Sequence, residues 1–283
     1  MTPLRAKMIE AMQVRGFSQR THESYLAAVT DLARYTRRSP ELLSIEDIER
    51  YFVYLATERE LAGASCRLFL NGIRFLYLQV LDWPAFDVAI PIPKRAQRIP
   101  ELLTRTEVTR ILEACDNPKH RMILTLCYGC GLRLNELLSL RVSHIDGERH
   151  WLRIEQGKGA KDRLVPLSPS LLEQLRAYWR LYRPRDWLFA GRTPGERLSE
   201  TSLQRAFTQA KARAGVKKIG GIHSRRHAYA THQLEAGLPV HRLQRLLGHR
   251  DLHSTLRYVH WVPDYREGCG AHDLIGALEV GHD

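Results

Sequence analysis

The chain has 283 residues, of which 44% are hydrophobic and 26% charged, a composition typical of a globular protein with length for one large or two small domains. No apolar run approaches a membrane span, and the opening MTPLRAKMIEAM lacks the apolar core of a signal peptide. Five cysteines, an odd number, do not indicate a disulfide framework. We therefore expect a cytoplasmic protein with no membrane partner.

The formal net charge of +12 favours a polyanionic partner. The surplus is concentrated, because residues 201–260 hold 11 Lys and Arg against two acidic residues, together with seven of the 13 histidines. A solvated charged face is the alternative interpretation. We favour a phosphate-facing surface, since these cations mix with His, Tyr and Gly over several separate segments.

The first 82 residues show helical patterns. Ser18 is expected to cap a helix over 19–35, and SIED at Ser44–Asp47 resembles a capping box before the next helix. A third helix is expected over 66–81. Residues 82–100 contain four prolines, which predicts an extended linker and a domain boundary near residue 95.

Helices return after the linker. Thr104 is expected to cap one over 105–115, an apolar helix follows to Gly131, and a short one covers 134–140. Residues 150–167 carry two β-prone runs around Gly-Lys-Gly, which predicts a hairpin. Helical patterns then resume. The sequence thus predicts a mainly α fold with a small antiparallel sheet, as domains 1–95, with the linker reaching about 100, and 101–283.

Several separated segments carry residues suited to a phosphodiester. Cleavage needs a nucleophile, an acid for the leaving oxygen, and guanidinium groups for the equatorial oxygens of the transition state. Arg133 lies just before a helix, and Lys158 lies at the hairpin tip. His223 and Arg226 are three apart at an expected helix start, so they share a face.

A polar segment near the C-terminus completes this set. LGHRDLHSTLRYVH places His249 just past a helix end and Tyr258 nine residues later. Tyrosine has a pKa near 10, so as a nucleophile it needs a strongly cationic site. We expect the residues between His249 and Tyr258 to form a tether.

These segments resemble the tyrosine recombinase (phage integrase) family. The patterns GLRxxELLxL, GKGxKxRxVPL, HxxRHxxATHxL and LLGHxDLxxTxxYxH occur in the family's order, and RGFSQRTHESYLAAV resembles its N-terminal opening. The resemblance covers the whole chain. It implies a helical core-binding (SAM-like) domain and a catalytic domain that together clamp double-stranded DNA.

The resemblance also implies roles. Tyr258 would attack the scissile phosphate to leave a 3′-phosphotyrosyl link, while Arg133 and Arg226 would hold the non-bridging oxygens. Lys158 would be the general acid, His223 would assist proton transfer at the tyrosine, and His249 would donate a hydrogen bond to the phosphate. Bond energy is conserved in the protein–DNA ester, so no metal or other cofactor is expected. Strand exchange between two duplexes implies a tetramer on DNA and leaves accessory proteins unassigned.

Several positions keep an alternative. Lys161 is a rival for the acid. Cys127 and Cys130 have the spacing of a zinc or redox pair, but no second pair follows and a buried helix is favoured. His227 and His232 could suggest a metal site, yet in the family pattern their duties are packing and hydrogen bonding. GKGAK lacks the Ser or Thr of a P-loop.

Further DNA contacts are expected from cations outside the catalytic set. Residues that could contact DNA, or be plain surface cations, are Arg20, Arg34, Arg67, Arg74, Lys94, Arg95, Arg98 and Arg225. Arg225 lies in HSRRH, where the family usually has hydrophobic residues, and would be an extra cation beside the site. The apolar tail 272–280 is expected to pack into a neighbouring protomer, or else to cap its own domain.

The spacing of 65 residues between Lys158 and His223 leaves little room for an inserted subdomain. This favours a compact Xer-like or transposon-associated enzyme over an integron integrase, which the N-terminal half resembles. Two other functions remain open. One is a catalytically silent DNA-binding protein on the same fold, and the other is a type IB topoisomerase.

Overall fold

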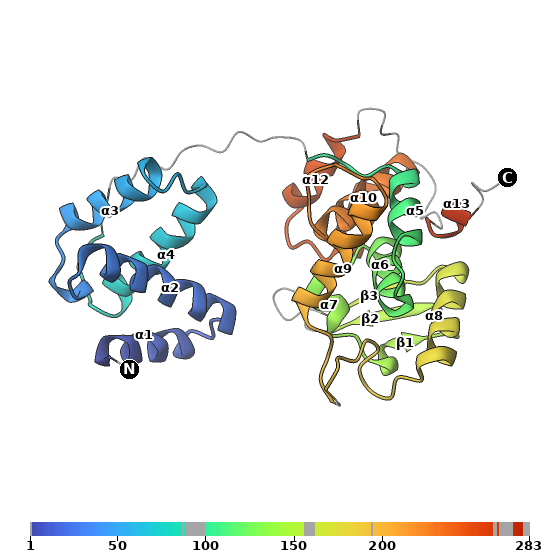
Figure 1. The fold of residues 1–283 in the computed structure, drawn as a ribbon, viewed down its shortest axis with the longest axis horizontal. Helices are drawn as coiled ribbons and strands as arrows, with labels where there is room; N and C mark the ends of the chain where they lie inside the picture. The colour runs from blue at the N-terminus through green and yellow to red at the C-terminus, as the bar shows by residue number, and fades with distance from the viewer. Residues whose placement is uncertain are drawn as a thin grey trace. The chain divides into compact units, whose positions relative to one another are not determined.

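The computed structural model describes residues 2–86, 88, 100–155, 162–193, 195–262, 265 and 274–279. The chain divides into two compact units, residues 1–98 and 99–283 (Figure 1). Each unit has its own hydrophobic core. Most elements are helices, and the described strands form one three-stranded antiparallel sheet in the second unit. The expected mainly α fold with a small antiparallel sheet is confirmed.

The N-terminal unit is helical. Its elements are α1 (Pro3–Val14), α2 (Gln19–Thr36), the 3-10 turn η1 (Pro40–Leu42), α3 (Ile45–Thr57) and α4 (Gly63–Gln79). The expected caps are confirmed: the hydroxyl of Ser18 accepts from the backbone N–H of Thr21, and Ser44 and Asp47 form a capping box. Such caps satisfy helix-end N–H groups that would otherwise lack partners.

The C-terminal unit combines the sheet with helices. Its elements are α5 (Arg105–Glu113), α6 (Pro118–Cys130), α7 (Leu134–Leu138), η2 (Val142–His144), β1 (Ile145–Asp146), β2 (Trp151–Ile154), β3 (Arg163–Pro166), α8 (Pro169–Tyr182), α9 (Glu200–Arg213), α10 (His223–Glu235), α11 (Val240–Leu247), α12 (His253–Val259) and α13 (Gly276–Glu279). The strands β2 and β3 pair antiparallel, with Leu152 opposite Val165. They are the arms of the expected hairpin.

Helix α6 forms the centre of this unit. Its residues from Met122 to Tyr128 are all buried, and α10 packs against it. The helix ends at Gly131, whose φ of 60° is left-handed and whose added Cβ would lie 2.3 Å from the ring of Tyr229. Glycine alone fits both requirements. This tight turn sets the direction in which the chain enters α7.

Helices α10, α11 and α12 pack against one another, and α11 also contacts β3. Helix α12 is a correction to the sequence analysis, which expected a tether there. The segment is polar, but Thr255 and Tyr258 are three residues apart and therefore share one buried face of a short helix. This arrangement brings residues from the hairpin, α7, α10 and α12 to one place.

The described part of the C-terminal tail packs on its own unit. Leu274 and Ile275 belong to the core of the C-terminal unit, and Ile275 contacts α6 closely enough that a Cβ at Gly129 would lie 3.0 Å from it. This is the second of the two expectations for the tail. Among the described residues, no helix has both the length and the apolar character to cross a membrane.

Candidate active site

Arg133 is positioned by the turn from α6 into α7, where it is the N-cap residue. Its guanidinium donates to the carboxylate of Glu136 at 2.7 Å and to the carbonyl of Gly248 at 3.0 Å. Gly248 ends α11, so this side chain joins two helices that are more than 100 residues apart in the sequence. The side chain of Arg133 is about one quarter exposed.

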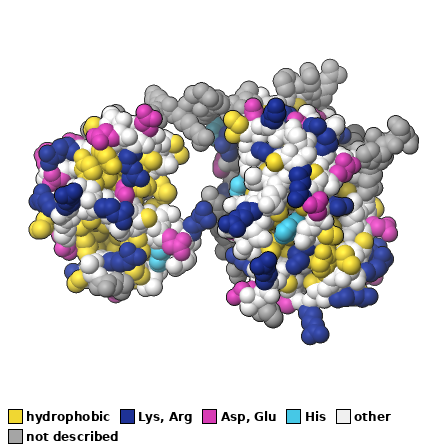
Figure 2. Space-filling view, in the orientation of Figure 1, with side chains coloured by type: hydrophobic (Ala, Val, Ile, Leu, Met, Phe, Trp, Pro, Cys, Tyr) yellow, Lys and Arg dark blue, Asp and Glu magenta, His cyan; other side chains and the backbone are white. Residues whose placement is uncertain are grey.

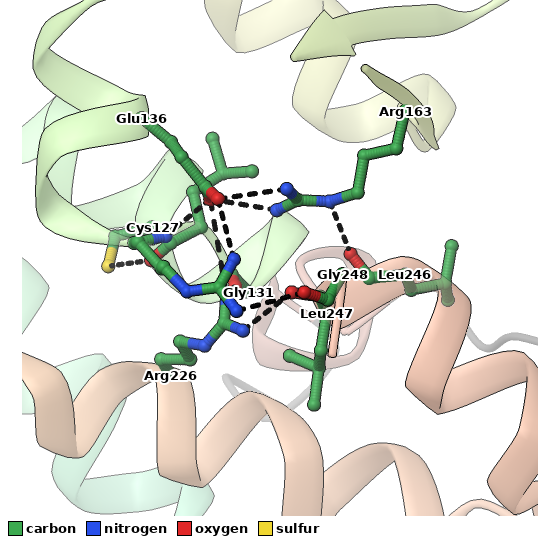
Figure 3. A network of polar contacts seen from close by, with 10 residues as sticks. Cys127, Gly131, Glu136, Arg163, Arg226, Leu246, Leu247 and Gly248 are labelled. Atoms are coloured by element: carbon green, nitrogen blue, oxygen red, sulfur yellow. Dashed lines mark hydrogen bonds and ion pairs between the residues drawn. The ribbon is translucent and has the colours of Figure 1, made fainter. Parts of the chain in front are cut away.

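Glu136 holds the arginines of the site together (Figure 3). It accepts two parallel hydrogen bonds from Arg163, of 2.8 and 2.7 Å, in addition to those from the side chain and backbone of Arg133. Burial would raise the pKa of Glu136, but the hydrogen bonds and charge of Arg163, followed by those of Arg133, outweigh it and lower the pKa to about 2. The carboxylate is therefore ionised at neutral pH.

Arg226 comes from the first turn of α10 and is only 5% exposed. It donates to the carbonyls of Gly131 and Leu247, at 2.5 and 2.6 Å, and lies 4.0 Å from Glu136 (Figure 3). Burial and the nearby charge of Arg133 lower its pKa to about 10, so it stays charged at neutral pH. Three guanidinium groups thus surround one described carboxylate, which leaves a positive site suited to an anion.

Tyr258 faces this cationic cluster from α12. It is 4% exposed, and its hydroxyl lies 3.0 Å from Nδ1 of His227. Burial raises the pKa of the phenol, while the charges of Arg226, Arg257 and Arg133 oppose that rise. The hydroxyl is therefore protonated at neutral pH and lies beside the group best able to stabilise its anion.

His249 follows α11, and its ring is held by Thr255 of α12. Its Nδ1 lies 2.8 Å from the hydroxyl of Thr255, a residue with no exposed surface. Its ring is parallel to that of Tyr258, with the centroids 6.2 Å apart. Burial, and then the charges of Arg226 and Arg133, lower the pKa of His249 to about 4. The imidazole is thus neutral, oriented and close to the tyrosine.

Two of the three histidines of α10, His223 and His227, lie in different surroundings. His223 is the first residue of the helix, as predicted, and its side chain is exposed. Partial desolvation of the ring, and then the charge of Arg226, lower its pKa. His227 is one turn later and partly buried, and it makes the contact with Tyr258 described above. Packing was its expected duty, and the sequence did not indicate this contact.

Arg225 is a correction. Its charge predicted a cation beside the site that faces DNA, but Arg225 has no exposed surface. One nitrogen donates to the carbonyl of Leu124 at 2.9 Å, and the guanidinium lies 5.6 Å from the centre of the Phe207 ring. Because α10 packs against α6, the residue beside Arg226 points into the core. It cannot reach a phosphate from there.

The remaining expected residues fall into two groups. Lys158, Lys161, Lys94, Arg95 and Arg98 lie outside the described residues. The N-terminal candidates are all exposed, and they are Arg20, Arg34, Arg67 and Arg74. Lys and Arg side chains spread over the visible face of each unit (Figure 2).

Cys127 and Cys130 are both buried in α6, as expected. Their sulfurs contact different carbonyls, those of Leu132 and Pro166, at 3.7 and 3.9 Å. Burial raises the pKa of both thiols, which disfavours the thiolate that a metal or a redox reaction would need.

Comparison with known families decides the identity of this arrangement. The sequence profile of the phage integrase family matches residues 101–263, and that of the phage integrase N-terminal SAM-like domain matches residues 4–85. The chain belongs to the phage integrase family. It is a tyrosine recombinase, an enzyme of DNA cleavage and religation that acts in site-specific recombination.

The sequences of known relatives align with this recombinase over most of their own length. A Sinorhizobium fredii protein, y4qK, named provisionally as an integrase/recombinase, is 45% identical over 92% of this chain and 84% of its own. A tyrosine recombinase of Pseudothermotoga lettingae is 32% identical over 89% and 91%. The crystal structure of a lambda integrase tetramer bound to a Holliday junction has the same fold, with a TM-score of 0.73 and 20% identity over 90% of this chain and 76% of that one.

The sequence did not indicate the roles of four residues of the recombinase site. They share one property: each contacts a proposed catalytic side chain or its support, and they are Glu136, Arg163, His227 and Thr255. Their signal in the sequence was their place inside the quoted family patterns. The distances that define their duties are set by packing and could not be read from the pattern.

Proposed function

We propose that this recombinase exchanges strands between two DNA sites through a phosphotyrosyl intermediate formed on Tyr258. The Tyr258 oxygen attacks the scissile phosphorus, a P–O(Tyr) bond forms and the P–O5′ bond breaks. The 5′ oxygen leaves with a proton, and the strand stays attached by its 3′ phosphate. A 5′-hydroxyl from the other duplex then reverses these steps and releases the tyrosine.

Arg133 and Arg226 are the proposed holders of the non-bridging oxygens. Planar guanidinium groups suit the equatorial oxygens of a pentacoordinate phosphorus, where charge develops. Their existing partners support this role, since Glu136 and the carbonyls of Gly131, Leu247 and Gly248 fix both side chains before any substrate arrives. A site that is already ordered does not spend binding energy on reorganisation.

Proton transfer and orientation are assigned to three further residues. Lys158 is the proposed general acid towards the 5′ oxygen. His223 assists proton transfer at the tyrosine, and His249 donates a hydrogen bond to the phosphate. The contact between His249 and Thr255 supports this last role, because a donor must be held in one ring orientation to be effective. No step consumes a nucleotide, since the ester conserves the bond energy.

Residues 1–95 and 101–283 are the proposed core-binding and catalytic domains of a clamp on double-stranded DNA, joined by the linker. The exposed arginines Arg20, Arg34, Arg67 and Arg74 are proposed phosphate contacts of the first domain, and the linker cations Lys94, Arg95 and Arg98 are proposed to cross the DNA backbone. Two duplexes require four active sites, so we propose a tetramer on DNA. The lambda integrase tetramer on a Holliday junction supports that assembly by analogy of fold.

One observation carries the catalytic assignment: the hydroxyl of Tyr258 lies in a buried site beside the guanidinium of Arg226, which is itself fixed by two backbone carbonyls. The test is a nicked suicide substrate that traps the covalent protein–DNA adduct. Wild-type protein should form the adduct, and Tyr258→Phe should bind the same DNA equally well without forming it. Retained attachment by Tyr258→Phe would place the nucleophile elsewhere. A wild type that binds but never attaches would instead indicate a silent binding protein.

A further inference from the structure

The hydroxyl of Tyr258 has a partner that the roles above do not use. Its hydrogen-bond partner among the described residues is His227, whose Nδ1 lies 3.0 Å from the phenol oxygen. The two residues come from α10 and α12, which pack against each other. His223, which is given the duty of assisting the tyrosine, lies one turn earlier on α10 and is exposed.

We propose that His227 accepts the proton of Tyr258 during attack and returns it when the phosphotyrosyl bond is broken. The inference rests on the proposed function of Tyr258. In the forward step the O–H bond breaks, its proton moves to Nδ1, and the freed oxygen lone pair forms the P–O bond as the 5′ oxygen departs. In the reverse step the imidazolium gives the same proton back to the leaving phenolate, so charge and atoms balance.

The geometry around the ring directs the proton to this nitrogen. The terminal nitrogens of Arg226 donate to the carbonyls of Gly131 and Leu247, and the hydrogen-bond partner of the phenol oxygen among the described residues is Nδ1 of His227, so the phenol's hydrogen can point at that nitrogen. The ring of Trp261 lies nearly perpendicular to both rings, with an interplanar angle of 84° to His227 and 83° to Tyr258. The ring of His249 is parallel to the tyrosine on another side. These contacts hold donor and acceptor in one arrangement.

The charges that face His227 keep it neutral in the free protein. Burial lowers its pKa to about 4, and the charges of His223 and Arg226 on its own helix and of Arg257 on α12 act in the same direction. A neutral imidazole has one nitrogen with a free lone pair, as a proton acceptor requires. A phosphate held by the arginines adds negative charge beside the ring, which raises its basicity when substrate binds.

The first experiment compares adduct formation on the nicked substrate by wild type, His227→Ala and His227→Asn, with the rate constant measured under single-turnover conditions. We expect His227→Ala to bind DNA as the wild type does but to react about 10² to 10⁴ times more slowly, the usual contribution of a general base. The Asn amide can accept a hydrogen bond near the Nδ1 position but is not a base, so it should also be slow. Added imidazole should partly restore His227→Ala.

Two variants serve as controls. His241→Ala removes an exposed histidine of α11 and should react at the wild-type rate. His223→Ala tests the rival acceptor, and it should lose less activity than His227→Ala. If His223→Ala is the slower of the two, or if His227→Asn keeps the wild-type rate, the proposal is wrong.

A second measurement does not depend on activity. Nitrogen NMR of the imidazoles in the free protein should show His227 as the tautomer protonated at Nε2, with a Nδ1 signal that shifts in Tyr258→Phe. A protonated Nδ1 would overturn the proposal even if the variants were too unstable for kinetics. The outcomes also separate the two levels of inference. Failure of wild type to attach to DNA refutes the proposed function, whereas normal attachment by His227→Ala refutes only the role of His227.

Discussion

Arg163 and Glu136 form a bidentate ion pair across 27 residues of sequence, with two N–H···O bonds of 2.8 and 2.7 Å. Both side chains are largely buried, and Arg163 also donates to the carbonyl of Leu246 at 3.0 Å. The pair therefore connects β3, which leads from the hairpin, to α7 and to the end of α11. Through Glu136 the pair contacts Arg133 and lies beside Arg226.

Glu136→Gln tests how much this ion pair contributes to the unfolding free energy. The substitution keeps the shape but leaves buried guanidinium groups without their counter-charge, so we expect the C-terminal unit to lose about 3–5 kcal/mol of unfolding free energy. Four of the five tryptophans lie in that unit, so tryptophan fluorescence in urea reports mainly on it. Asp116→Asn is the matched control, because Asp116 pairs with Arg213 on the surface and should cost less than about 1 kcal/mol. Equal small losses would show that the buried pair is not a support.

The same carboxylate should give the stability a distinct pH dependence. Its pKa is lowered to about 2 in the folded protein from the ordinary 4.5, so its stabilisation is complete above about pH 4.5 and is lost as the pH falls towards 2. The full effect is about 3 kcal/mol. His227, His232 and His249, with pKa values of about 4, cause a separate loss that begins near pH 6.5 in any variant.

Urea unfolding at a series of pH values separates these contributions. The difference in unfolding free energy between wild type and Glu136→Gln should be constant from pH 7 to about 5 and then shrink towards pH 2–3. The histidines titrate in both proteins and cancel in this difference. A difference that does not change with pH would show that Glu136 is not strongly ionised in the folded state.

How far the sequence could predict this molecule depends on the range of each interaction. The caps at Ser18, Ser44 and Thr104 involve residues three apart, and all were predicted correctly. The bond from Arg133 to the carbonyl of Gly248 joins positions 115 residues apart, and no local pattern specifies it. The family resemblance supplied the proposed reacting groups, but not the contacts that hold them.

Helix α12 and Arg225 show the two ways in which local reasoning failed. The segment around Tyr258 is polar in composition, yet its buried face consists of the two residues Thr255 and Tyr258, which is too short a pattern to indicate a helix. Arg225 is charged, which by itself predicts exposure, but tertiary packing of α10 on α6 fixes the inward direction. In both cases, packing against a neighbouring helix determines which side chains are buried.

Arg225 should be replaceable by methionine without loss of DNA binding. Its Nε and second terminal nitrogen have no hydrogen-bond partner within the described part of the chain, and burial lowers its pKa to about 10, so a charged group is held there at a cost. Arg225→Met keeps the stem and removes the unpaired donors, so its unfolding free energy should be equal to that of wild type or higher.

Arg225→Ala is the contrasting variant. It leaves a cavity beside Phe207 and should lose about 2–5 kcal/mol, as large-to-small substitutions in cores do. For Arg225→Met, DNA affinity measured at several salt concentrations should show the wild-type slope, because no phosphate contact is lost. A shallower slope would return Arg225 to the DNA interface.

Thr255 should control catalysis through His249 alone. Its hydroxyl lies 2.8 Å from Nδ1 of His249 and has no exposed surface, so Thr255→Val removes the bond while preserving the shape of α12. We expect about a tenfold slower covalent attachment, the equivalent of one hydrogen bond, with unchanged DNA affinity. Thr255→Ser restores the hydroxyl and should recover most of the rate. Thr125→Val is the control, because that buried hydroxyl donates within α6 to the carbonyl of Arg121 and should leave attachment unchanged. If Thr255→Val and Thr255→Ser react alike, orientation of His249 by this contact does not contribute to the reaction.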